Sequence, residues 1–78
     1  MNYQDEILAF LKEKTGKESL SAEERIFSGG LLDSFGVLEL IAFLEEKFCV
    51  EIDTAKYEIK DFDTLNLIVE LVTKIKSN

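Results

Sequence analysis

Ser34 is the residue of this chain whose type and position best suit chemistry, because it follows a glycine-broken loop and opens an amphipathic stretch. Asp33 before it is a suitable helix cap, since its carboxylate can accept hydrogen bonds from amides that a first helical turn leaves unpaired. Ser34 then falls in that first turn, where free N–H groups and the helix dipole favour an attached anion. The pattern predicts a hydroxyl placed to hold a phosphodiester.

The same hydroxyl is poorly equipped as a catalytic nucleophile. The chain contains no histidine, which excludes Ser–His and Cys–His activation and histidine-containing metal sites. Neither Lys12 nor Lys47 stands at a spacing diagnostic of a Ser–Lys pair. A lone serine at a helix start is more often a plain structural residue, so the residues around Ser34 must decide its role. We expect that the chain is not an enzyme.

The composition indicates one acidic globular domain spanning residues 1–78. Its 46% hydrophobic content, four glycines and lack of proline are typical of a folded chain rather than a disordered one. The net charge of -7 argues against nucleic acid as a partner, which needs a basic surface, and against binding to an anionic membrane. Basic patches on partner proteins suit this charge better.

Cysteine content and hydropathy set the expected environment. The single cysteine, Cys49, cannot form an internal disulfide, and its place just after an apolar helix predicts a buried structural thiol. The sequence shows no signal peptide and no apolar run long enough to span a membrane. We therefore expect a cytoplasmic protein without membrane insertion. We also expect the chain to be a monomer.

The apolar spacing predicts an all-α fold, a small bundle of three main helices plus one short helix. The main helices are expected at about Tyr3 to Thr15, at about Ser34 to Phe48 and from a cap at Asp63 to about Lys76, with the short one at about Thr54 to Ile59. Asn2 is the expected cap of the first helix. A long structured loop joins the first two main helices, and its capping-box pattern Ser21-Ala22-Glu23-Glu24 predicts a short helical turn.

The helix that opens at Ser34 carries two apolar stripes. At about 100° per residue, one arc combines the expected core residues Val37, Leu40, Ile41, Leu44 and Phe48. The second stripe, in the same half-turn as Ser34, combines Phe35, Leu38 and Ala42 and is flanked by Glu39, Glu45 and Glu46. Neighbours covering both sides would explain two stripes, but with so few other elements an exposed interaction surface is favoured. Gly36 either leaves room for a bulky attachment or is an inexpensive first-turn glycine.

The residues around Ser34 carry a resemblance to a known family. Gly30-Leu31-Leu32-Asp33-Ser34-Phe35, continuing through Glu39-Leu40 to Leu44-Glu45-Glu46-Lys47-Phe48, resembles the acyl carrier protein superfamily, which serves fatty-acid, polyketide and peptide biosynthesis. The family pattern is Asp-Ser-Leu at the opening of the second helix, and in this chain Phe35 replaces the leucine. With Gly36 included, the stretch is especially similar to D-alanyl carrier proteins. Length, acidity, the long first loop and Phe62-Asp63-Thr64 extend the resemblance over the whole chain.

The resemblance implies a free-standing acyl or aminoacyl carrier protein, which presents a cargo and catalyses nothing itself. Ser34, with Asp33 beside it, would carry 4′-phosphopantetheine through a phosphodiester, and the thiol of that arm would hold the cargo as a thioester. The implied partners are a phosphopantetheinyl transferase, an acyl- or aminoacyl-activating ligase and a downstream transferase or synthase. These enzymes would meet the surface formed by Phe35, Leu38, Glu39, Ala42, Glu45 and Glu46.

Departures from the pattern of fatty-acid carriers favour a specialised pathway. Gly36 stands where those carriers usually have an acidic residue, Lys47 replaces one of their carboxylates, and no proline follows the second helix. A D-alanyl carrier protein of cell-envelope modification is an alternative within the same class. An unmodified acidic helical interaction module, using the same apolar stripe, is the alternative of another class.

Overall fold

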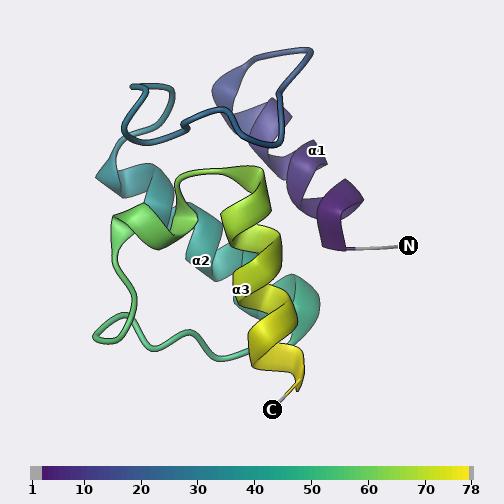
Figure 1. The fold of residues 1–78 in the computed structure, drawn as a ribbon, viewed down its shortest axis with the longest axis vertical. Coiled ribbons are helices and arrows are strands. Elements are labelled where there is room, and N and C mark those ends of the chain that lie inside the picture. The colour runs from purple at the N-terminus through teal and green to yellow at the C-terminus, as the bar shows by residue number, and fades with distance from the viewer. Residues whose placement is uncertain (1–2, 78) are drawn as a thin grey trace.

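The computed structural model describes residues 3–77, which form an all-α bundle without strands in that range (Figure 1). The elements are α1 (Tyr3–Thr15), α2 (Ser34–Phe48), the short 3₁₀ helix η1 (Ile59–Phe62) and α3 (Leu65–Ser77). Helix α1 packs on α3, and η1 contacts both α2 and α3. The prediction of three main helices, one short helix and a long first loop is confirmed.

Helix α1 has the predicted bounds. Ile7 and Leu11 point into the core and are fully buried. Gly16 ends the helix with a φ of 75°, a conformation that glycine adopts without steric cost, and its amide donates to the Lys12 carbonyl at 2.9 Å. The predicted cap, Asn2, lies outside the described residues.

Helix α2 also has the predicted bounds, and its inner stripe lies in the core as expected. Val37, Leu40, Ile41 and Leu44 are buried in one hydrophobic cluster with residues of α1 and α3. Phe48 is only half-buried, because it closes the end of the bundle against Tyr3, with the two ring centroids 5.0 Å apart. Cys49 follows with a φ of 55°. It is exposed, so the prediction of a buried thiol was wrong.

The start of α3 differs from the prediction. Asp63 does not cap this helix. The Thr64 hydroxyl takes that role, accepting a hydrogen bond from the Leu67 amide at 3.1 Å. Asp63 instead faces the long loop, where its carboxylate accepts hydrogen bonds from the Phe27 and Ser28 amides. The inner face of α3 then buries four apolar residues: Leu65, Ile68, Leu71 and Val72.

The long loop between α1 and α2 contains turns but no helix. A turn forms where predicted, with the Glu24 amide donating to the Ser21 carbonyl at 3.2 Å, but it is not helical. The Ser21 hydroxyl accepts from the Glu23 amide at 3.2 Å, which forms a local turn. Beyond it, the Ile26 amide donates to the Asp63 carbonyl at 2.7 Å. Backbone donors that a helix would use internally are thus taken by a distant segment. Ile26 itself is buried in the core.

The short helix lies later in the chain than predicted, at Ile59–Phe62 instead of Thr54 to Ile59. Asp53 accounts for the shift, because its side chain accepts from the Ala55 amide at 3.0 Å and makes residues 54–56 a turn. Glu58 and Asp61 then form a capping box that starts the 3₁₀ helix.

No helix within residues 3–77 is long and apolar enough to cross a membrane.

Candidate functional site

Ser34 is exposed and is the first residue of α2. Asp33 before it is extended, with φ -105° and ψ -173°, and its carboxylate accepts a hydrogen bond from the Gly36 amide at 3.1 Å. This is the predicted N-cap, so the placement of the hydroxyl in the first helical turn is confirmed. The positive end of the helix dipole lies at this point and favours a negatively charged substituent.

The backbone before Ser34 is held by a turn around Ile26. The amides of Leu31 and Leu32 both donate to the Ile26 carbonyl, at 2.9 and 3.0 Å. Gly30 allows this reversal with a φ of 83°. Because Ile26 is buried, the turn is anchored in the core while its outer end presents Ser34 to solvent.

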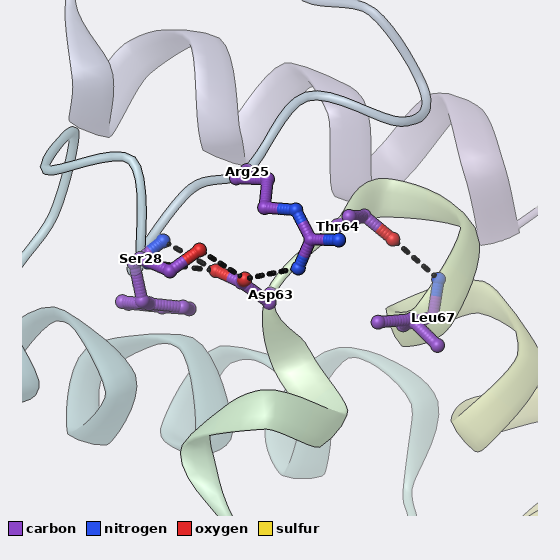
Figure 2. A network of polar contacts seen from close by, with 6 residues as sticks. Arg25, Ser28, Asp63, Thr64 and Leu67 are labelled. Carbon is purple, nitrogen blue, oxygen red and sulfur yellow. Dashed lines mark hydrogen bonds and ion pairs between the residues drawn. The ribbon is translucent and has the colours of Figure 1, made fainter.

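Asp63 is the residue of this site that sequence reasoning missed, and it is only 4% exposed. Its carboxylate accepts from the Phe27 and Ser28 amides at 2.8 and 2.9 Å and from the Ser28 hydroxyl at 2.6 Å. Arg25 adds an ion pair at 3.4 Å. Figure 2 shows Arg25 and Ser28 of the loop converging on Asp63, while Thr64 bonds to Leu67. Asp63 therefore fastens the serine-bearing loop to the start of α3.

The pKa of Asp63 follows from opposing effects. Burial raises the pKa, because a charged carboxylate loses its water. The hydrogen bonds from Ser28, from the Phe27 amide and from Arg25 lower it, and together they prevail, so the pKa lies below its ordinary value. Asp63 is consequently ionised at neutral pH. The sequence does show a carboxylate before an apolar run at Asp63. That pattern is also typical of an ordinary helix cap, so it did not reveal that Asp63 holds the loop.

Two hollows border Ser34, and Ile59 lines both of them. The larger, of about 390 Å³, lies toward the long loop and has polar and charged lining residues: Arg25, Ser28, Asp33, Lys60 and Asp63, with Phe27, Leu32 and Ile59. The smaller, of about 280 Å³, lies between α2 and η1 and is mostly apolar, with Val37, Leu38, Ile41, Tyr57, Ile59 and Phe62. An exposed hydroxyl with open space beside it fits the attachment of a flexible prosthetic group.

The outer stripe of α2 is exposed, as the sequence suggested. Phe35 is 67% and Leu38 61% exposed, and Ala42 follows on the same face. Large apolar side chains that stay exposed to water are typical of a surface that a partner covers.

The three flanking carboxylates have different surroundings. Glu39 pairs with Lys14 of α1 at 3.3 Å. Glu45 turns to the chain after the helix and accepts from the Ile52 amide at 2.9 Å, which gives it a structural task. Glu46 is exposed. The rim next to the apolar stripe is therefore formed by Glu39 and Glu46, whereas Glu45 helps to fix the segment after α2.

Gly36 does not leave open room for an attachment. It is buried, and a Cβ atom placed on it would lie 3.1 Å from the Cβ of Leu32. The close approach lets the loop fold tightly over the first turn of α2. Of the two explanations that the sequence left open, neither describes this packing role.

Comparisons with known proteins find relatives of this chain. The chain is 31% identical over 78 residues to the D-alanyl carrier protein of Bacillus velezensis, an alignment covering 97% of this chain and 100% of the relative. It is 38% identical over 55 residues to that of Streptococcus sanguinis, covering 70% of each chain. It is 30% identical over 78 residues to that of Lactobacillus acidophilus, covering 99% of each.

No family model matches the chain. The relatives still show the family of the chain, because two of them align with it at 30% identity or more over nearly their whole length. Proteins of this kind generally carry 4′-phosphopantetheine, interact with transferases and ligases, and are not catalysts themselves. The chain is a carrier protein and belongs to the family that includes these D-alanyl carrier proteins.

Proposed function

We propose that Ser34 carries 4′-phosphopantetheine and that the chain presents an acyl or aminoacyl group to the enzymes of a specialised pathway. The observation that carries this proposal is the exposed hydroxyl at the first position of α2, behind the Asp33 cap. When bound, the arm supplies a terminal thiol that holds the cargo as a thioester. Tethering raises the effective concentration of the cargo at each enzyme that docks.

The residues of the chain have positioning tasks in this function. Asp33 and Gly36 hold the first turn of α2, which keeps the Ser34 hydroxyl pointing away from the core. A phosphopantetheinyl transferase would join the serine oxygen to the pantetheine-side phosphorus of the coenzyme A pyrophosphate. The hydroxyl loses its proton, the bridging P–O bond breaks, and adenosine 3′,5′-bisphosphate leaves. The positive end of the helix dipole then favours the phosphodiester that results.

The partner surface is the exposed stripe of α2. Phe35 and Leu38 provide its apolar centre, and Glu39 and Glu46 provide charge that suits a basic patch on the transferase, the activating ligase or the downstream enzyme. We expect these encounters in the cytoplasm. The net charge of -7 would speed them at low ionic strength.

D-alanine is the first cargo to test, because the relatives are named D-alanyl carrier proteins. An ATP-dependent ligase specific for D-alanine should then charge the phosphopantetheinyl form. The departures at Gly36 and Lys47 from the fatty-acid carrier pattern favour a specialised cargo over service to the main fatty-acid synthase. Comparing D-alanine, other amino acids and short acyl groups as substrates of the charging ligase would identify the cargo.

Intact-mass spectrometry tests the attachment site. The parent, incubated with coenzyme A and a phosphopantetheinyl transferase, should gain the mass of one phosphopantetheinyl group. Ser34→Ala should gain nothing, whereas Ser19→Ala, which removes an exposed serine of the loop between α1 and α2, should behave as the parent. No gain on the parent would favour an unmodified interaction module, and a gain on Ser34→Ala would place the arm on another residue.

A further inference from the structure

A second surface with aromatic and acidic character lies between α1 and α2. The rings of Phe10 and Phe43 stack there, with centroids 4.3 Å apart and planes 20° from parallel. Hollows of about 590 Å³ and 310 Å³ border this pair of rings. We call their combined lining the α1–α2 groove; it consists of Glu6, Ala9, Phe10, Glu13, Lys14, Glu39, Ala42, Phe43 and Glu46.

The groove carries more negative than positive charge. Four of its residues are glutamates and Lys14 is the one cation among its lining residues, although Glu6 also pairs with Lys47 at 3.2 Å. Lys14 pairs with Glu39 at 3.3 Å and also lies 5.7 Å from the centroid of the Phe10 ring. Glu13 and Glu46 are both exposed. The groove already shows, with Lys14, how a cation packs between a carboxylate and an aromatic face.

We propose that the α1–α2 groove binds a partner protein through a segment that presents a bulky apolar side chain between two cationic ones. The stacked rings offer an apolar floor for the bulky side chain, and the exposed Glu13 and Glu46 beside them are available to the cationic ones. The surrounding glutamates complement the flanking cations of such a segment and disfavour an acidic one. The proposal rests on the proposed function only for the identity of the partner, which would be an enzyme of the carrier pathway.

The groove extends the α2 surface beyond the attachment site. Glu39, Ala42 and Glu46 belong both to the groove and to the predicted partner surface. Phe43 follows Ser34 by nine positions, which corresponds to about 13 Å along a helix. A partner anchored in the groove therefore leaves the serine hydroxyl accessible, so docking and chemistry use different ends of α2.

A peptide titration followed by two-dimensional ¹⁵N NMR tests the chemistry of the groove. The probe is acetyl-Arg-Phe-Arg-amide, and acetyl-Glu-Phe-Glu-amide and acetyl-Arg-Ser-Arg-amide are its charge and apolar controls. We expect amide shifts concentrated at residues 6–14 and 39–46 with the first probe, and at least threefold weaker binding of either control. The same result is expected for the Ser34→Ala chain, because this binding does not need the prosthetic arm.

Two variants and a matched control make the test specific. Glu13→Lys reverses one rim charge and Ala9→Arg fills the groove with a cation; both positions are exposed on α1, so the fold should persist. Each should weaken the probe at least threefold. Glu70→Lys, the same reversal at an exposed position of α3, should change the affinity by less than twofold. Equal losses in Glu13→Lys and Glu70→Lys, or shifts spread over the whole acidic surface, would overturn the proposal without touching the assignment of Ser34.

Discussion

Asp63 receives hydrogen bonds from the loop that leads to Ser34, although 35 residues separate it from Ser28. Because its pKa is lowered in the folded protein, the ionised carboxylate favours the folded state. The unfolded value is about 3.9. The contribution is therefore complete above that pH and is lost as the pH falls through the lower folded pKa.

Asp63→Asn should lower the free energy of unfolding at pH 7 by about 1–3 kcal/mol, because buried amide donors lose a charged acceptor. Urea unfolding at pH 7 and at lower pH checks this. The gap between parent and variant should shrink below about pH 4, where the unfolded parent also binds the proton. Asp53→Asn, in an exposed turn that asparagine also forms, should change little. A penalty independent of pH would exclude the carboxylate charge as its origin.

Cys49 has a left-handed backbone, with a φ of 55°, directly after α2. Residues with a Cβ atom are strained in this conformation. Glycine adopts it without that strain and is therefore common at the ends of helices. Since Cys49 is exposed, its replacement removes little packing. Cys49→Gly should therefore raise the free energy of unfolding by about 0.5–1 kcal/mol over Cys49→Ala, after the larger unfolded-state entropy of glycine is included. Equal urea midpoints of the two variants would contradict this account.

At the scale of elements, the apolar periodicity of the sequence predicted those features that depend on residues close together in the chain. The bounds of α1 and α2, the Asp33 cap and the exposed Phe35 stripe all follow from local spacing. The predictions were wrong where a polar group that was expected to bond locally forms its hydrogen bonds with a distant segment instead. Asp63 resembles a helix cap, and only the folded chain shows that the loop amides take its carboxylate and leave Thr64 to cap α3. The turn at Ser21 likewise does not continue into a helix, because the Ile26 amide donates to the distant Asp63 carbonyl.

The two faces of α2 give a paired prediction. Leu40 is fully buried and Leu38 is 61% exposed, although they are only two positions apart. Leu40→Ala should cost about 2–5 kcal/mol of unfolding free energy, because it removes buried methyl groups and leaves a cavity. Leu38→Ala should change stability by no more than about 0.5 kcal/mol. Chemical denaturation of both variants provides the measurement.

The same pair separates stability from partner binding. Under the proposed function, Leu38→Ala should reduce the rate of phosphopantetheinyl transfer at limiting carrier concentration, because it removes an exposed contact of the partner surface. A Leu38→Ala chain that unfolds like Leu40→Ala would show that the outer stripe belongs to the core.

At the scale of the whole molecule, the acidic charge acts against compactness. Residues 3–77 occupy extents of 32 × 29 × 19 Å, and the full chain carries a net charge of -7. At about 0.01 M salt the screening length is about 30 Å, so carboxylates on opposite sides still repel one another. The ion pairs between α1 and α2, Lys14–Glu39 and Glu6–Lys47, are partly exposed and each contributes little. The charge that suits basic partners therefore has a cost in stability.

Added sodium chloride should consequently stabilise the folded chain, because screening weakens the net repulsion more than the few exposed ion pairs. Between about 0.01 and 0.3 M, the thermal midpoint should rise by several degrees, since about 1 kcal/mol corresponds to roughly 4–8 °C in a domain of this size. The double variant Glu18→Lys and Glu51→Lys, changed at exposed positions, removes more than half of the net charge. It should be more stable than the parent at low salt and should respond less to added salt. A parent whose midpoint falls with salt would show that its ion pairs outweigh its repulsion.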